Sequence, residues 1–152
     1  MTLRLPGALA DEIRRHGEAV YPAECCGALI GRMESMPGDG GAGQDDVKDV
    51  LRLWPAVNRR TDDPHRYLIA PDDLRRLERE VREAGQEILG YYHSHPDHPA
   101  RPSAFDAEHA WPWYSYLIVR IERGRAAELA SWVLDDERAQ MHPESLDVLS
   151  EV

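Results

Sequence analysis

The sequence has few of the features that mark secreted, membrane-spanning or disulfide-stapled proteins. Its 152 residues include only two cysteines, Cys25 and Cys26, and neighbouring cysteines can provide neither a disulfide framework nor a four-ligand structural zinc site. No apolar run approaches the roughly 20 residues that cross a bilayer. The N-terminal segment lacks the long apolar core and small-residue cleavage site of a signal peptide. These absences predict a cytoplasmic protein that does not contact a membrane.

Positive charge is also scarce. The chain has 18 basic and 28 acidic residues, a formal net charge of -10, and a single lysine, Lys48. A chain of this charge with no basic stripe repels phosphate backbones, so nucleic acid is not an expected partner. A hydrophobic content of 42% at this length fits one domain with a single core.

Two segments have the pattern of amphipathic helices. The first follows Pro6, with an apolar stripe of Leu9, Ile13, Gly17 and Val20, and Pro22 ends it. The second begins at Pro71, followed by Asp72 and Asp73, which favour the positive end of a helix dipole. Its apolar face is Leu74, Leu77, Val81 and Ala84, and Gly85 is a natural stop.

Short apolar runs between glycines and turn residues predict strands. Pro55 indicates that one of them, 47–57, lies at a sheet edge or that its pairing ends early, and the last two form a pair around Gly124. A short helix should run from Ser103 and stop before Pro112. Helices and strands alternating in this way indicate an α/β fold with a mixed sheet. The predicted strands cover residues 26–32, 47–57, 66–69, 87–93, 116–121 and 128–134.

Two segments are not expected to join the core. Residues 34–46 are rich in Gly, Asp, Ser and Pro, which predicts an exposed, flexible loop that could act as a lid. Residues 136–152 are polar and predict a loose C-terminal tail, in which Leu146 and Leu149 could dock as part of a short helix. The expected domain therefore covers residues 1–135.

The informative stretch is His93-Ser94-His95-Pro96. Residues i and i+2 of a strand point to the same face, so both imidazoles can converge on one ion at roughly 2.0–2.1 Å. Ser103 is suited to cap the next helix, which places Asp106 at its third position and makes it a candidate third ligand. Two histidines and a carboxylate leave a fourth position for water, which is the pattern of a catalytic zinc site. Such a site needs a base, and Glu24, before the first apolar strand, is the candidate.

Together, Glu24, His93-Ser94-His95-Pro96, Ser103 and Asp106 closely resemble the signature of the JAMM/MPN+ zinc metalloproteases. In that signature an upstream Glu is followed by His-x-His, seven residues, Ser, two residues and Asp, and all of it is present here. The resemblance extends from about Leu9 to Leu134. It implies a cytidine-deaminase-like α/β fold, with the mixed sheet packed between helices.

The resemblance also implies roles. His93, His95 and Asp106 would hold Zn²⁺ with a water. Glu24 would accept the proton of that water and pass it to the leaving amine, and Ser103 would hydrogen-bond the bound water or the developing oxyanion. The short form and Glu24-Cys-Cys-Gly look like bacterial members of the family. Some of these resemble peptidases that release cysteine from the Gly-Gly-type C-terminus of a ubiquitin-like sulfur-carrier protein. The expected partner is therefore a ubiquitin-like or sulfur-carrier substrate.

Several alternatives stay open. Other relatives act on other ubiquitin-like conjugates, and the motif does not choose between these substrates. A non-catalytic MPN-type interaction module shares the fold but lacks the metal residues. A zinc deaminase is disfavoured because its His-x-Glu and Pro-Cys-x-x-Cys signature is absent. His98, His109 and Cys25 are interpreted as packing or surface residues rather than as ligands. An exposed sheet edge could also pair two chains into a homodimer.

Overall fold

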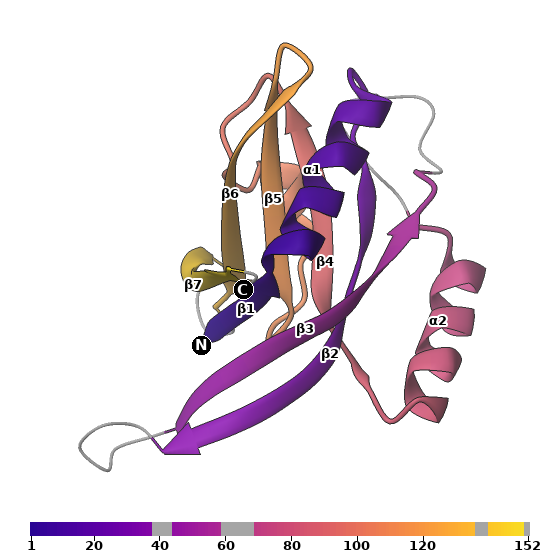
Figure 1. Ribbon diagram of the computed structural model, residues 1–152, viewed down its shortest axis with the longest axis vertical. Coiled ribbons are helices and arrows are strands. Elements are labelled where there is room, and N and C mark those ends of the chain that lie inside the picture. Colours follow the sequence, from indigo (N-terminus) through magenta and orange to yellow (C-terminus); the bar gives the residue numbers. More distant parts are fainter. Residues whose placement is uncertain (38–43, 59–68, 136–139, 151–152) are drawn as a thin grey trace.

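The computed structural model describes residues 1–37, 44–58, 69–135 and 140–150, and all elements named below lie within these ranges (Figure 1). The strands and helices follow one another as β1 (Thr2–Pro6), α1 (Gly7–Val20), β2 (Cys26–Pro37), β3 (Gln44–Ala56), α2 (Pro71–Glu83), β4 (Glu87–Pro96), α3 (Ala104–Glu108), β5 (Ser115–Glu122), β6 (Arg125–Leu134) and β7 (Met141–Leu149).

The strands form one mixed sheet that closes on itself in the order β1-β3-β2-β4-β5-β6-β7. Antiparallel pairs join β3, β2 and β4 on one side and β5, β6 and β7 on the other. The two groups meet through the parallel pair β4–β5. Closure depends on β1, which runs parallel to both β3 and β7. The α/β fold with a mixed sheet, expected from the sequence, is confirmed.

The two long helices cover opposite faces of this sheet. Leu29 belongs to the cluster packed around α1, whereas its neighbours Ala28 and Ile30 belong to the cluster around α2. The α1 cluster is the larger. It requires a close approach at Gly17, where an added Cβ would lie 2.7 Å from Cδ1 of Ile121.

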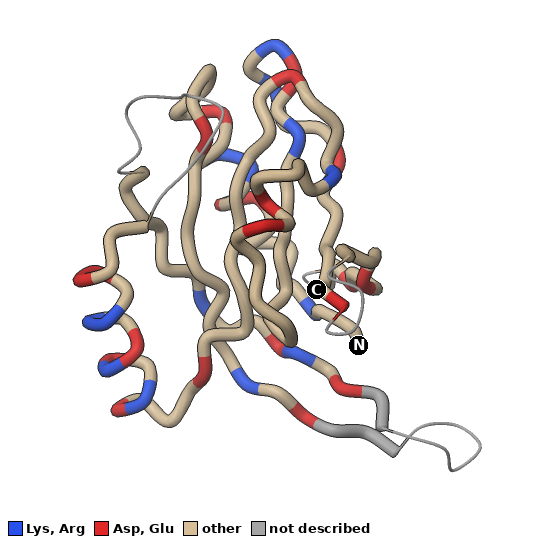
Figure 2. Tube along the Cα trace, turned by 180° about the vertical axis from the view of Figure 1, so that it is seen from behind, with Lys and Arg blue, Asp and Glu red and all other residues tan. Residues whose placement is uncertain are grey.

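The predicted limits of α2 are confirmed. Pro71 starts the helix, Asp72 and Asp73 occupy its first turn, and Gly85 follows with a φ of 68°, a value that glycine adopts without strain. Leu77 and Val81 are buried. Charges of both signs alternate along the outer side of α2 (Figure 2). None of the helices in the described ranges has the length and apolar content needed to cross a bilayer.

The structure corrects two expectations. The segment expected as a loose tail or short helix contains β7, which pairs with β1 and β6. The boundary placed at residue 135 stays a prediction. Within the expected loop 34–46, residues 34–37 and 44–46 are the paired ends of the β2–β3 hairpin, because backbone pairing tolerates their polar composition. The apex of that loop and most of the expected strand 66–69 lie outside the described residues.

Pro55 lies where β3 is an edge. The pairing of β1 with β3 ends at Asp49, and beyond it β2 is the only strand among the described residues that pairs with β3. Pro55 therefore leaves no ladder hydrogen bond unmade on a second side, as the sequence predicted.

Four buried polar side chains from four strands contact one another, and they are called the lysine cluster below: Lys48, Ser115, Ser131 and Glu144. The ammonium of Lys48 donates to Ser115 Oγ at 2.9 Å and to the carbonyl of Trp113, and lies 3.9 Å from Glu144 Oε2. Ser131 donates to the other oxygen of Glu144 at 2.8 Å. Burial lowers the pKa of Lys48, and the charge of Glu144 opposes that shift.

Candidate functional site

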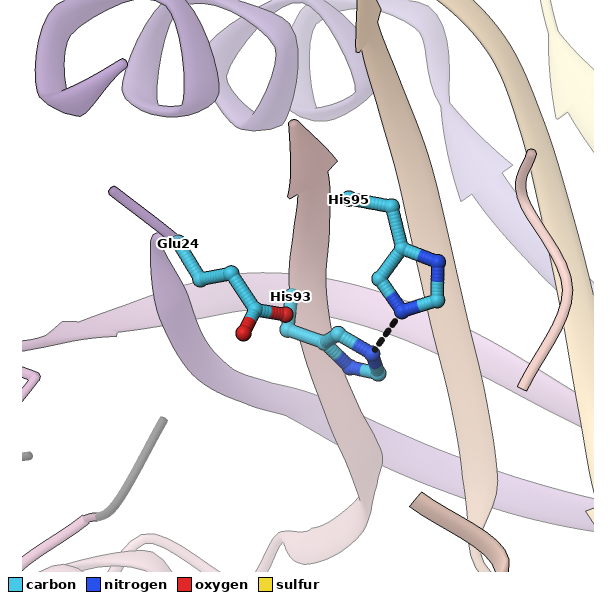
Figure 3. Close-up of side chains that lie close together, drawn as sticks. All are labelled: Glu24, His93 and His95. Atoms are coloured by element: carbon cyan, nitrogen blue, oxygen red, sulfur yellow. Dashed lines mark hydrogen bonds between the residues drawn. The ribbon is translucent and has the colours of Figure 1, made fainter. Parts of the chain in front are cut away.

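The two histidines lie side by side at the end of β4. Both side chains are buried, with 1% and 8% exposed, and their Nε2 atoms are 3.1 Å apart (Figure 3). Ser94, between them, points to the α1 face, where its Cβ lies 3.4 Å from the position of a Cβ added at Gly17. Strand alternation therefore directs both imidazoles away from α1, as the His-x-His pattern predicted.

Asp106 reaches the histidines because of the way α3 begins. Ser103 caps the helix: its Oγ accepts from the N–H of Asp106 at 3.1 Å, and its own N–H donates to Asp106 Oδ2 at 2.9 Å. This reciprocal capping box holds the carboxylate at the helix start. There, Asp106 Oδ2 lies 3.2 Å from His93 Nε2 and 3.0 Å from His95 Nε2.

The loop between β4 and α3 is anchored at its first residue. Asp97 adopts a left-handed φ of 57°. Its carboxylate accepts from Tyr21 Oη at 2.6 Å and from the N–H of Arg123 at 2.8 Å, while its own N–H donates to Ile121 O at 2.7 Å. These contacts tie the loop to the end of α1 and to the β5–β6 turn. The loop carries the carbonyl of Pro99 to 2.8 Å from His95 Nδ1.

That carbonyl fixes the tautomer of His95. A carbonyl oxygen only accepts, so Nδ1 of His95 carries the proton and Nε2 of the neutral ring presents a lone pair. The lone pair faces Asp106 Oδ2, which is also an acceptor. Backbone carbonyls hold metal-binding histidines in the same way.

The pKa shifts of His93 and Asp106 favour the protonation states that bind metals. Burial lowers the pKa of His93, although its contact with Asp106 opposes the shift, so the imidazole is neutral in the ordinary pH range. Burial alone would raise the pKa of Asp106, but its contacts with the two imidazoles and with the N–H of Ser103 outweigh burial and hold that pKa well below the ordinary value. A neutral imidazole and an ionised carboxylate are the forms that bind metals.

Glu24, two residues before the start of β2, reaches the same point. The β2–β4 register sets Cys26 opposite His93, which brings the preceding Glu24 beside the histidines (Figure 3). Its backbone is held on both sides, because Ser94 Oγ accepts from the N–H of Cys25 at 2.8 Å and Asn58 Nδ2 donates to Glu24 O at 3.2 Å. The side chain is 2% exposed. Ligand atoms of Glu24, His93 and His95 all lie within 4.8 Å of one another.

These four residues, Glu24, His93, His95 and Asp106, are called the histidine cluster below. Three of its atoms, the two Nε2 atoms and Asp106 Oδ2, are separated by 3.0–3.2 Å. Ligands at 2.0–2.1 Å from a tetrahedral ion are about 3.3 Å apart. Converging acceptors at this spacing, oriented by a carbonyl and a helix cap, fit a divalent cation such as zinc.

A cleft of about 400 Å³ opens beside these residues. Glu24, His95 and Ser103 line it together with the apolar side chains of Pro96, Pro99 and Phe105. His98, Arg101 and Ala104 complete the lining. The dimensions suit an extended peptide segment or a small ligand.

The structure assigns different surroundings to the other candidate residues. His109 ends α3, where its ring stacks on Phe105 at a centroid distance of 4.1 Å. Cys25 and Cys26 are buried free thiols, and burial raises their pKa values to about 11 and about 12. Neither thiol is therefore in the ionised form that binds metals near neutral pH.

Sequence reasoning did not identify Ser94, Asn58, Arg101 or the carbonyl of Pro99. Ser94 and Asn58 act through backbone contacts with residues far away in the sequence, which no local pattern reveals. For Arg101 one signal was present: it is a basic residue inside the loop that joins the histidine and serine halves of the motif.

Comparison with known proteins places these features in a family. Residues 6–135 match the family described as prokaryotic homologs of the JAB domain. A desampylase from Haloferax volcanii is 35% identical over 98 residues, 64% of this chain and 62% of the relative, so the match spans less than two thirds of its length. A protein named as a probable TtuB-protein conjugate cleaving protease, from Thermus thermophilus, is 29% identical over 83% of this chain and 75% of the relative.

Solved structures give the same result for the fold. A protein from Desulfitobacterium hafniense matches with a TM-score of 0.77 and 28% identity, over 100% of this chain and 95% of the other. A protein from Salinibacter ruber matches with a TM-score of 0.65 and 38% identity, over 96% and 90%. A JAB1/MPN domain protein from Archaeoglobus fulgidus, at 16% identity and a TM-score of 0.55 over 97% and 96%, shares the fold.

Proposed function

Because the chain belongs to the family of prokaryotic JAB-domain homologues, we propose that it is a JAMM-type zinc peptidase that hydrolyses an amide bond at the C-terminus of a ubiquitin-like protein. The observation that carries the proposal is the convergence of His93 Nε2, His95 Nε2 and Asp106 Oδ2 within 3.2 Å of one another, beside the buried carboxylate of Glu24 and a cleft that a peptide can enter.

In this proposal His93, His95 and Asp106 hold the zinc ion. Zinc bound there supplies Lewis-acid polarisation of the scissile carbonyl and lowers the pKa of water to about 7. The loop carbonyl of Pro99 and the capping N–H of Ser103 keep two of these three side chains oriented, so that they need little reorganisation on binding.

Glu24 is the proposed general base. It takes a proton from the attacking water and delivers it to the leaving amine, so that the amide C–N bond breaks and one water is consumed. The contacts of Ser94 with the N–H of Cys25 and of Asn58 with Glu24 O hold this stretch of backbone in place beside the histidines. No covalent intermediate with the protein is needed.

Ser103 is proposed to stabilise the oxyanion. Its Oγ accepts from the N–H of Asp106, which leaves the hydroxyl hydrogen free to be donated. A donor that meets charge developing only in the transition state contributes to kcat. The residue would therefore cap α3 and assist the reaction with the same oxygen atom.

The names of the relatives support a ubiquitin-like substrate. One is a desampylase and the other a probable protease of TtuB-protein conjugates. A Gly-Gly-type C-terminus suits the cleft, since glycines allow a backbone to approach the site closely. We propose the more specific reaction as the release of cysteine from the C-terminus of a sulfur-carrier protein. Action on other ubiquitin-like conjugates is the second candidate.

Three further points stay predictions. A non-catalytic, metal-binding interaction module is the alternative from a different class. A homodimer would suit the edge of β3, where Leu51 is 50% exposed. Cytoplasmic location is expected from the sequence.

Mass spectrometry tests the reaction. A ubiquitin-like sulfur carrier ending in Gly-Gly-Cys is incubated with the zinc-loaded protein, and the carrier is weighed before and after. We expect the loss of one cysteine residue, and we expect a chelator to prevent it. An unchanged carrier, with zinc confirmed in the protein, would exclude the sulfur-carrier substrate and direct the search to conjugates.

The variant Glu24→Gln separates the enzyme from the interaction module. Glutamine keeps the shape of the side chain and removes its ability to accept a proton. We expect the rate to fall by about 10²- to 10⁴-fold while zinc content stays at the wild-type level. Full activity in this variant would show that Glu24 is not the base.

A further inference from the structure

Arg101 stands at the cleft, two residues before Ser103. Its backbone N–H donates to Pro99 O at 2.8 Å, the same carbonyl that orients His95. Arg101 lines the cleft together with Glu24, His95 and Ser103, and it also borders a more open pocket beside Trp132 and Met141. The loop that orients the histidine therefore also carries an arginine to the rim of the cleft.

No carboxylate of the described residues forms an ion pair with the exposed side chain of Arg101. Within the part of the chain that the structure describes, it forms no ion pair or side-chain hydrogen bond, whereas Arg120 pairs with Glu122 and Glu128. Other exposed arginines among the described residues, such as Arg79 and Arg125, also form no ion pair, so Arg101 differs from them in its place at the cleft. A cation that is exposed and unpaired at a cleft is available for an anionic group of a ligand.

The reaction class specifies where such an anion can come from. If a single amino acid follows the scissile bond, its α-carboxylate lies one residue from the reacting carbonyl. If the amine comes from a lysine side chain of a second protein, no carboxylate occupies that place. A planar guanidinium binds a carboxylate through two parallel hydrogen bonds, which neither an amide nor a backbone carbonyl reproduces.

We propose that Arg101 binds the α-carboxylate of the residue released, so that the protein prefers ubiquitin-like chains extended by one amino acid over lysine-linked conjugates. This inference rests on the proposed hydrolysis and adds its substrate class. Arg101 is then a specificity determinant, and Glu24 and Ser103 act equally on both kinds of substrate.

Three substrates built on one carrier test the proposal. A ubiquitin-like sulfur carrier ending in Gly-Gly is extended with alanine as the free acid, with alanine carboxamide, or with the side-chain amine of a lysine peptide. Alanine replaces cysteine so that no substrate thiol binds the metal. We expect the wild-type protein to favour the acid over the carboxamide by about 10- to 100-fold in kcat/KM, the usual effect of a charge-assisted pair, mainly through KM.

The same ratio is measured in two variants. Arg101→Gln should bring the ratio of acid to carboxamide close to one, and Arg101→Lys should retain part of the preference. Arg79→Gln, which makes the same chemical change on the exposed side of α2, should keep the wild-type ratio. A protein that only lost stability would lose activity on all substrates and leave the ratio unchanged.

The possible negative results separate the role of Arg101 from the proposed peptidase activity. Equal cleavage of the acid and the carboxamide by wild-type protein, or an unchanged ratio in Arg101→Gln, would overturn the role of Arg101 and leave the peptidase standing. No cleavage of any of the three substrates by zinc-loaded protein would overturn the proposed function itself.

Discussion

Two groups of polar side chains are buried in this protein, and they differ in what they contain. The lysine cluster joins Lys48 to Glu144 through a charge contact and serine hydroxyls. The histidine cluster brings Nε2 of His93 and Nε2 of His95 within 3.2 Å of Asp106 Oδ2, and it borders an open cleft. The side chains of the lysine cluster come from strands, whereas the histidine cluster adds Glu24, before β2, and Asp106, in α3, to the histidines of β4.

The difference lies in where the positive charge comes from. The lysine cluster has its own cation, enclosed with its counter-charge, so that its charges balance without a ligand. The histidine cluster has acceptors that converge and a base beside them, and a cation from outside would balance it. Burial alone therefore does not identify a functional site. An excess of acceptors at an accessible place does.

Removal of one histidine should have the largest effect. His95→Ala deletes a proposed ligand, and we expect loss of zinc and of all measurable peptidase activity. In the wild type, zinc at 100 times its Kd should add about 2.7 kcal/mol to the free energy of unfolding, and in the variant this gain should disappear. Zinc content and thermal unfolding with and without a chelator measure both.

The matched control is His142→Ala, which removes an exposed histidine on β7 that pairs with Asp135. This variant should retain zinc and the full response to it. If the wild type bound no zinc and unfolded identically with chelator, the histidine cluster would be balanced without a cation, and the contrast with the lysine cluster would disappear.

Breaking the lysine cluster should affect stability instead of metal binding. Lys48→Met leaves the carboxylate of Glu144 buried without its counter-charge, which should cost about 3–5 kcal/mol. The double variant Lys48→Met, Glu144→Leu removes both charges and should recover most of that loss. Denaturant unfolding gives the free energies, and zinc content should stay at one ion per chain in any variant that folds.

A partly exposed ion pair between β1 and β3 provides the control. Arg4 lies 3.7 Å from Asp49 with both side chains partly exposed, and Arg4→Met should change stability by only about 0–1 kcal/mol. If the double variant were as unstable as Lys48→Met alone, volume and packing rather than charge would explain the role of Lys48.

The smallest effect concerns the thiols next to Glu24. Their pKa values of about 11 and about 12, against 9.0 for an ordinary thiol, mean that folded protein should resist alkylation at pH 8, whereas unfolded protein should react. Above pH 9 the unfolded chain loses these protons and the folded chain keeps them. The stability that the thiols contribute is therefore complete below pH 9 and decreases as the pH rises toward 11.

Rapid alkylation of folded protein would mean that the β2–β4 region opens readily. The closed surroundings assigned to Cys25 and Cys26 would then be wrong. Denaturation curves between pH 8 and pH 10.5 provide an independent measurement of the same pKa difference.

Local sequence patterns were sufficient to predict much of the fold. The apolar stripe, Pro71 and Gly85 predicted α2, and alternation placed His93 and His95 on one face. Ser103 was recognised as a helix cap, and the cap brings Asp106 toward the histidines. Each of these features depends on residues within about one turn or one strand, so the sequence contains the information in a readable form.

Other features depend on partners far away in the sequence. Glu144 reads as a surface residue because its partner Lys48 lies on another strand, and β7 was therefore taken for a tail. The five residues of β1 are stabilised by β3 and β7 rather than by their own pattern. The place of Glu24 beside His93 follows from the β2–β4 register, and before the structure only family resemblance suggested it.

The parallel pairs of β1 set an order of events during synthesis. All four residues of the histidine cluster have been translated by residue 106, but β1 has only one of its two neighbours until β7 has left the ribosome. Pairs such as Thr2 with Ser145 and Pro6 with Leu149 are among the contacts most distant along the chain, and such contacts slow folding. A nascent chain that stops before residue 141 would contain the complete histidine cluster inside a barrel that has not yet closed.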